Sequence, residues 1–166
     1  MRQFMFILSL ILSSTLLHSE AFAQHTRRTN PNTLAVEGLG RGVLYSVQFD
    51  RVVSDDLSAG FGFGTVGATI GTSQPLIPFY MIYYLNRDAR SVFVTAGASW
   101  LVNGAAAGGQ VSSLGSMTFP ASGVIPNFGL GYESRSDSGF LFRVAAYGLI
   151  TTTFNPWFGF TFGYSF

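Results

Sequence analysis

The chain has 166 residues, of which 48% are hydrophobic and 10% are charged, and its net charge is +1. Soluble domains usually carry about 25% charged residues, so this composition does not fit an ordinary water-exposed surface. The small net charge gives no basis for binding nucleic acid, and the lack of cysteine excludes disulfides and a lipoprotein anchor.

Residues 1–23 are typical of a secretory signal peptide, with a basic start, an apolar core and a small-x-small cleavage site at Ala21-Phe22-Ala23. The alternative is an uncleaved membrane anchor, but the apolar core is shorter than the roughly 20 residues that a spanning helix needs. We expect residues 24–31 to be a short, disordered periplasmic lead. Residues 32–166 then form one folded domain, and we expect no second domain after it.

The folded part divides into eight segments with a period of two, separated by turn residues. Most of them have the length of about 9–11 residues that a tilted strand needs to cross a membrane. Successive side chains of a strand point to opposite faces, and each segment has an apolar face and a small or polar face. The predicted strands are 33–39, 43–53, 57–68, 76–85, 91–102, 124–135, 139–151 and 157–166.

The second strand illustrates the assignment of faces. Its outward residues would be Val43, Tyr45, Val47 and Phe49, and its inward residues Ser46, Gln48 and Asp50. The fourth strand is ambiguous, because an apolar outward face leaves Tyr80 and Ile82 inside. We expect the interior to be filled by small and hydrophilic side chains, with inward glycines that make room for Tyr80, Tyr147 and Trp157.

The predicted fold is all-β: an eight-stranded antiparallel up-and-down barrel that crosses a membrane and closes its first strand on its last. Two alternatives remain. The uncharged stretches 91–132 and 144–166 could be membrane helices, although their prolines, glycines and period of two argue against it. A soluble lipocalin-like carrier is the other, but its outward apolar faces would meet water.

The connections alternate in character. Those at 51–56, 86–90 and 135–138 are short and charged, whereas those at 67–74, 103–123 and 152–156 are nearly uncharged. Outer-membrane barrels have short periplasmic turns and longer outer loops. We therefore expect both termini to face the periplasm, with 103–123 as the main outer loop and a very tight outer turn at Gly40-Arg41-Gly42.

The chain ends in aromatic residues at alternate positions: Phe160, Phe162, Tyr164 and Phe166. This ending, the cleavable leader and the eight-strand pattern together resemble the small bacterial outer-membrane β-barrels of the OmpA transmembrane domain and OmpX type, over about residues 33–166. The resemblance implies a Gram-negative outer-membrane location and delivery by the general secretion route and periplasmic chaperones. It also implies insertion by the barrel assembly machinery, which reads the last strand.

The candidate functional residues are charged and polar side chains predicted to face the interior. A buried charge is costly unless it is paired, so these side chains should pair across the barrel. They could form a gate in a narrow polar conduit, or an ion-pair plug that helps to set the strand register. We favour the plug, because an eight-stranded interior is normally filled. The candidates are Glu37, Gln48, Asp50, Glu133 and Arg143.

We expect no catalytic, cofactor or metal site. The two histidines, His18 and His25, fall in the signal peptide and the lead, so the predicted barrel lacks the usual base for a serine nucleophile. The leading hypothesis is a monomeric, non-enzymatic outer-membrane barrel in contact with outer-membrane lipid, with a structural or surface-interaction role. The alternatives are a narrow pore for small solutes and, less favoured, an enzyme that modifies outer-membrane lipid.

Overall fold

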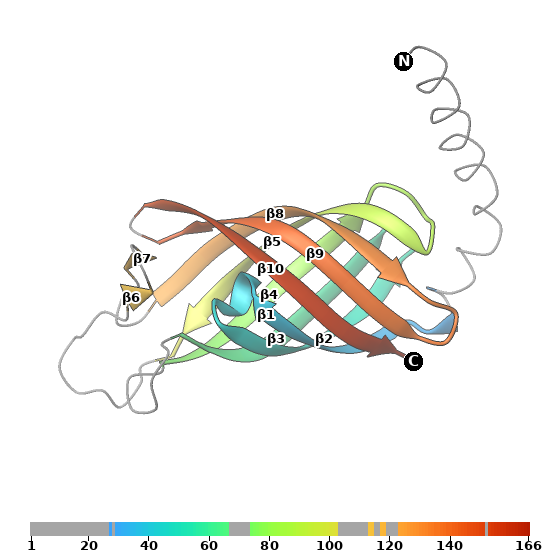
Figure 1. Cartoon of the computed structure of the whole chain (residues 1–166), viewed down its shortest axis with the longest axis horizontal. Coiled ribbons are helices and arrows are strands. Elements are labelled where there is room, and N and C mark those ends of the chain that lie inside the picture. The colour runs from blue at the N-terminus through green and yellow to red at the C-terminus, as the bar shows by residue number, and fades with distance from the viewer. Residues whose placement is uncertain are drawn as a thin grey trace, which may run out of the picture.

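The structure is a computed structural model that describes residues 27, 29–66, 74–102, 113–114, 117–118, 123–151 and 153–166. Its barrel strands are β1 (Asn32–Leu39), β2 (Tyr45–Ser54), β3 (Leu57–Val66), β4 (Gln74–Tyr84), β5 (Arg90–Leu101), β8 (Gly123–Arg135), β9 (Phe140–Ile150) and β10 (Phe154–Ser165). They close into an antiparallel barrel in the order β1-β10-β9-β8-β5-β4-β3-β2, as Figure 1 shows. Two short strands, β6 (Ser113–Leu114) and β7 (Met117–Thr118), form a separate pair.

The pairing of β1 with β10 closes the barrel. Asn32 and Phe166 exchange two backbone hydrogen bonds, of 3.0 and 2.8 Å, and the register continues to Leu39 opposite Gly159. The predicted all-β up-and-down fold is therefore confirmed, and the helical alternative is wrong, because its two stretches contain β5, β8, β9 and β10.

No helix in the described part of the chain is both long enough and apolar enough to cross a membrane.

The two ends of the barrel differ in their connections. We call the end that holds Asn32 and Phe166 the terminal end, and the opposite end the loop end. At the terminal end, β2, β4 and β8 are followed by turns of two to five residues. Much of the predicted main loop at the loop end lies outside the described residues.

The outward face is apolar and exposed. Strand alternation predicts this. The structure also resolves the fourth strand, whose faces were ambiguous: Phe79, Met81 and Tyr83 of β4 are about half exposed, whereas Tyr80 and Ile82 are buried. On β10, the exposed residues are Phe154, Pro156, Phe158, Phe160, Phe162 and Tyr164, and the buried ones are Gly159, Thr161 and Ser165.

Part of the interior is apolar, so the predicted small and hydrophilic filling accounts for only part of it. Five side chains near the loop end of their strands point inward and are at most 1% exposed: Val66, Leu76, Leu101, Ile125 and Leu149. Val43 belongs to the same apolar cluster, and Trp157 packs against it. These side chains leave water by packing on one another, which closes this part of the interior without polar partners.

The connection from β1 to β2 turns into the barrel. A single helical turn, η1 (Gly40–Gly42), lies within the length of the barrel in Figure 1, and its three residues are buried. Leu39 and Val43 have φ angles of 59° and 66°, which non-glycine residues rarely adopt. The prediction that Val43 belongs to the second strand and points outward was wrong, because this bend carries Val43 inside and β2 begins at Tyr45.

Gly60 on β3 makes room for Tyr80 in the interior. A Cβ atom at Gly60 would lie 2.6 Å from Tyr80 Cζ and 2.8 Å from the backbone oxygen of Phe49. We expect Gly60→Val to lower the free energy of unfolding by about 1–3 kcal/mol, the usual cost of overpacking. Urea titration in detergent measures this change. Ala59→Val is the control, since its side chain points outward; an equal loss in both variants would contradict this role of Gly60.

Candidate functional site

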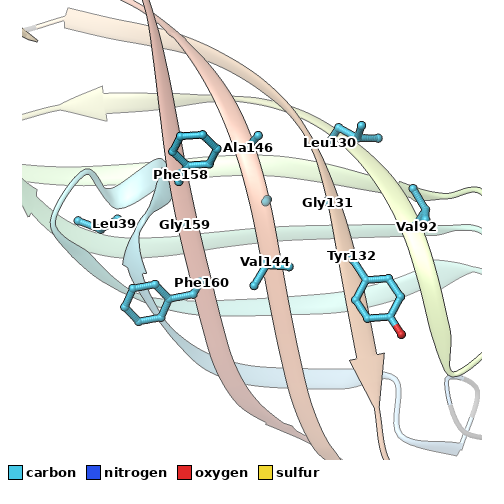
Figure 2. A pocket seen from close by; sticks show the side chains of 11 residues that line it. Leu39, Val92, Leu130, Gly131, Tyr132, Val144, Ala146, Phe158, Gly159 and Phe160 are labelled. Carbon is cyan, nitrogen blue, oxygen red and sulfur yellow. The ribbon is translucent and has the colours of Figure 1, made fainter.

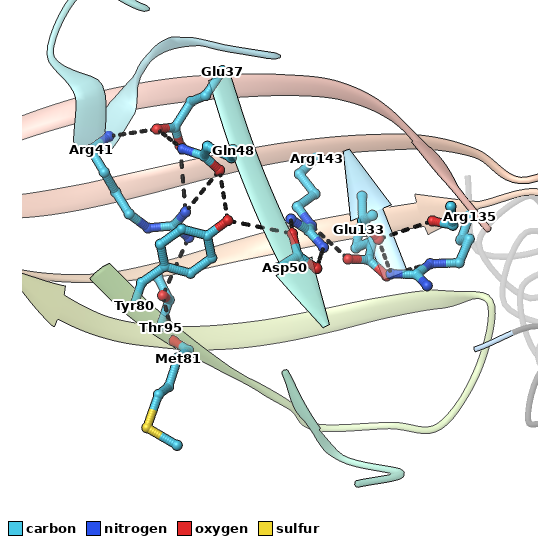
Figure 3. Close-up of polar contacts among 12 residues, drawn as sticks. Glu37, Arg41, Gln48, Asp50, Tyr80, Met81, Thr95, Glu133, Arg135 and Arg143 are labelled. Carbon is cyan, nitrogen blue, oxygen red and sulfur yellow. Dashed lines mark hydrogen bonds and ion pairs between the residues drawn. The ribbon is translucent and has the colours of Figure 1, made fainter. Parts of the chain in front are cut away.

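All five interior candidates lie inside the barrel, and each is at most 2% exposed: Glu37, Gln48, Asp50, Glu133 and Arg143. Their strands place them there, because each occupies an inward position of β1, β2, β8 or β9. Figure 3 shows that they form two clusters along the barrel, one around Arg143 and one around Glu37.

Arg143 on β9 bridges two carboxylates. Its Nη1 and Nη2 atoms donate to the two carboxylate oxygens of Asp50, at 2.8 and 3.1 Å, and its Nε atom donates to Glu133 at 2.6 Å. Asp50 lies on β2 and Glu133 on β8, which occupy opposite sides of the barrel. The Arg143 cluster therefore ties opposite walls together with charge-assisted hydrogen bonds, which are stronger than neutral ones.

Glu37 on β1 is the acceptor of the second cluster. Gln48 Nε2 donates to Glu37 Oε2 at 2.5 Å, and the Tyr147 hydroxyl donates to Oε1 at 2.9 Å. The backbone N–H of Arg41 adds a third hydrogen bond, of 2.9 Å. The Glu37 cluster thus joins β1, β2 and β9 to the inturned segment η1.

Tyr80 connects the two clusters. Its hydroxyl oxygen lies 3.0 Å from Gln48 Oε1 and 3.4 Å from Asp50 Oδ2. The hydroxyl has a single proton, so it donates to one of these two acceptors at a time. Polar groups in close contact therefore extend from Glu37 to Glu133 along the interior. This chain is poorly suited to relaying protons, because the guanidinium of Arg143 stands between the last two carboxylates and does not deprotonate in proteins.

Arg41 is an interior residue that the sequence did not identify. Its guanidinium carbon lies 3.8 Å from the centre of the Tyr80 ring and 5.1 Å from that of Tyr147, within the range of cation–π attraction. Its Nη1 atom is 3.8 Å from Glu37 Oε1, and its Nη2 atom donates to the Thr95 hydroxyl at 3.3 Å. The predicted tight outer turn is therefore part of the interior filling.

Three further residues surround Glu133 and were not identified from the sequence. The Tyr84 hydroxyl donates to Glu133 at 2.8 Å, and the Nε atoms of Arg135 and Arg27 lie 3.4 and 3.6 Å from its other oxygen. Arg27 falls in the stretch expected to be a disordered lead, yet it is 2% exposed. Its neighbours 24–26 and 28 lie outside the described residues.

A charge count along the inward faces could have found one of these arginines. Buried strand positions carry three acids, Glu37, Asp50 and Glu133, but only two basic residues, Arg135 and Arg143. An unpaired buried charge is costly, so this deficit predicts one more cation from outside the strands. Arg41 supplies it. Nothing in the sequence marks Arg27.

The four residues of the predicted assembly signal lie on the other face of the wall. Phe160, Phe162, Tyr164 and Phe166 are 45%, 48%, 57% and 54% exposed. The rings of Phe160 and Phe162 meet nearly edge to face, with centroids 6.0 Å apart. These residues form a continuous outward aromatic stripe, and its recognition by the assembly machinery stays a prediction.

Within the described ranges, no group of three or more histidine, cysteine, aspartate or glutamate side chains could hold a metal ion. Both histidines lie outside those ranges. The expectation that the protein lacks a catalytic site therefore stays a prediction.

An apolar groove of about 550 Å³ lies in the outward face of the wall. Figure 2 shows that most of its side chains belong to β8, β9 and β10, with Leu39 of β1 on one side and Val92 of β5 on the other. Strand register forms two ridges along it, one from Phe158, Ala146 and Leu130 and one from Phe160, Val144 and Tyr132. The hollow is thus separate from the buried polar clusters.

Removing Arg143 should destabilise the barrel by leaving Asp50 without its guanidinium. We expect Arg143→Met to lower the free energy of unfolding by about 3 kcal/mol, as for other broken buried ion pairs. Adding Asp50→Asn should recover part of this loss, because a neutral amide then replaces the unpaired carboxylate. Urea titration of the two single variants and the double variant measures both effects; strictly additive losses would contradict the pairing.

Arg87→Ala is the control for this experiment. Arg87 is 52% exposed and pairs with Asp56 at 2.9 Å in the turns of the terminal end. The hydrogen bond to Asp56 raises the pKa of Arg87 above its ordinary value. Exposed pairs contribute little to stability, so this variant should unfold close to the unchanged protein.

Comparison with known proteins identifies the fold. No protein-family model and no curated protein matches the chain. The N-terminal β-barrel domain of Pseudomonas aeruginosa OprF is similar in structure, with a TM-score of 0.62 and 15% sequence identity over 82% of this chain and 98% of that domain. At this identity the likeness concerns the fold, and the chain has the fold of a small OmpA-like barrel with eight strands.

Proposed function

We propose that the chain is an integral protein of the bacterial outer membrane, with a structural or surface-interaction role and without catalysis. The observation that carries this proposal is the contrast between the two faces of the wall: apolar side chains are exposed outside, and charged ones are buried and paired inside. Apolar surface in water costs about 25 cal/mol per Å², whereas lipid chains cover it without that cost.

The strand lengths support a membrane-spanning barrel. Seven of the eight barrel strands have 10 to 13 residues, which suits tilted strands that cross an apolar layer. The outward groove between Phe158 and Tyr132 would then be filled by lipid chains. Outer-membrane lipid is accordingly the first partner that we propose.

The filled interior supports a structural role over a pore. The Arg143 cluster joins opposite walls, and the Glu37 cluster with Arg41 fills the next layer toward the loop end. Eight strands leave an interior just wide enough for side chains. Solutes would need both clusters to rearrange, so a narrow pore is the weaker candidate.

The proposal includes an orientation and a route of assembly. The short turns suit the periplasmic side, which would put both termini there and the loop end at the cell surface for contact with other molecules. Periplasmic chaperones and the barrel assembly machinery of a Gram-negative cell would deliver and insert the barrel, reading the stripe that ends in Phe166. We propose that the folded protein is a monomer.

Phe166→Ser should reduce the amount of folded protein in the outer membrane, because it removes the last residue of that stripe. The measurement is cell fractionation followed by gels of unboiled and boiled samples, in which a folded barrel migrates differently until boiled. Phe140→Ser is the control, since Phe140 is outward on β9 and 53% exposed, against 54% for Phe166. Equal losses in the two variants would contradict a special role of Phe166. For the protein without substitutions, a gel mobility that boiling does not change, or recovery in the soluble fraction, would overturn the membrane proposal.

Liposomes that contain the protein should swell in sugar solutions no faster than empty liposomes, because the polar clusters fill the interior. Swelling of reconstituted liposomes measures this directly. Rapid swelling would favour the pore instead.

Mass spectrometry of lipid A from cells with and without the protein tests the enzyme alternative, and a changed acylation pattern would contradict a role without catalysis.

A further inference from the structure

Arg27 occupies a pocket at the terminal end of the barrel. Its guanidinium carbon lies 3.8 Å from the centre of the Tyr84 ring, and its Nη1 atom donates to the backbone oxygen of Asn86 at 3.2 Å. Its Nε atom is 3.6 Å from Glu133 Oε1. An aromatic face, a carboxylate and a carbonyl oxygen therefore surround one planar cation.

The pocket is held in place by residues other than Arg27. Tyr84 is fixed by its hydroxyl hydrogen bond to Glu133, and its ring packs against Phe93 at 6.2 Å. Asn86 Oδ1 accepts hydrogen bonds from the Ser91 hydroxyl at 2.8 Å and from the backbone N–H of Val92 at 3.2 Å. The site would thus persist if Arg27 left it.

The charge balance indicates that Arg27 can leave. Among the described residues, the other buried charges are three arginines and three acids, so Arg27 is the extra cation. Glu133 keeps Arg143 and Arg135 without it. Two nitrogen atoms of Arg27, Nε and Nη2, have no hydrogen-bond partner among the described residues. Departure of Arg27 therefore leaves no buried carboxylate unpaired.

From these contacts we infer that the terminal end contains a guanidinium-binding site, which Arg27 fills from within the chain and which an arginine side chain or a small guanidinium ion can fill in its place. A guanidinium suits it better than an ammonium, because it is flat enough to stack on Tyr84 while its edges meet Glu133 and the Asn86 oxygen. The site goes beyond the proposed function and does not depend on the membrane location.

The test uses the full chain in detergent with labelled tyrosine, and Tyr84→Phe identifies the Tyr84 ring signal in the NMR spectrum. In Arg27→Ala, we expect methylguanidinium to shift that signal in a saturable manner and methylammonium to bind at least tenfold more weakly. The unchanged protein should need a methylguanidinium concentration at least tenfold higher for the same shift, because Arg27 is attached to the chain and competes for the site. Gels of unboiled samples check that each variant is folded.

Two further variants sharpen this test. Arg87→Ala removes an exposed arginine at the same end and should behave like the unchanged protein. Arg27→Lys keeps the charge without the flat group, so methylguanidinium should still bind, and this variant replaces Arg27→Ala if the latter does not fold. Equal shifts in all variants, equal binding of the two cations, or no binding after loss of Arg27 would each overturn the inference.

Discussion

The structure depends on the hydrogen bonding between β1 and β10, which turns a sheet into a closed wall. Asn32 and Phe166 are far apart in sequence, yet their backbone groups satisfy each other. Once the wall is closed, it has no exposed strand edge. Successive side chains of each strand then point alternately to the outside and to the interior, which are two separate environments. The exposed aromatic residues of β10 and its buried Gly159, Thr161 and Ser165 both follow from this constraint.

The closed wall encloses a narrow interior, and side chains fill it in layers along the barrel. Near the loop end, apolar side chains around Ile125 pack on one another. The next two layers are polar, and there the acids are paired: Glu37 with neutral donors and Arg41, and Asp50 with Arg143. Removing one partner of a buried pair leaves the other charge unpaired, so a shifted strand register that separated these partners would be costly.

The sequence predicted the strands and their faces because a period of two is a local property, visible without knowledge of the fold. It placed Glu37, Asp50, Glu133 and Arg143 at inward positions for the same reason. It could not name their partners, because pairing depends on which strands lie opposite each other. Arg41 was missed because the alternation of side chains gives no direction outside strands. The bend that carries Arg41 inside is made by Leu39 and Val43, residues of types that do not usually adopt positive φ.

The two interior stacks of arginine on tyrosine differ in how they are held. Tyr80 and Tyr84 lie four residues apart on the inward face of β4, and each receives an arginine at 3.8 Å, Arg41 from the loop end and Arg27 from the terminal end. Arg41 is tied on both sides to β1 and β2, and no other arginine in the described part of the chain pairs with its acid Glu37. Arg27 precedes β1 and shares Glu133 with two arginines. The same chemistry therefore gives a fixed filling at one end and an exchangeable one at the other.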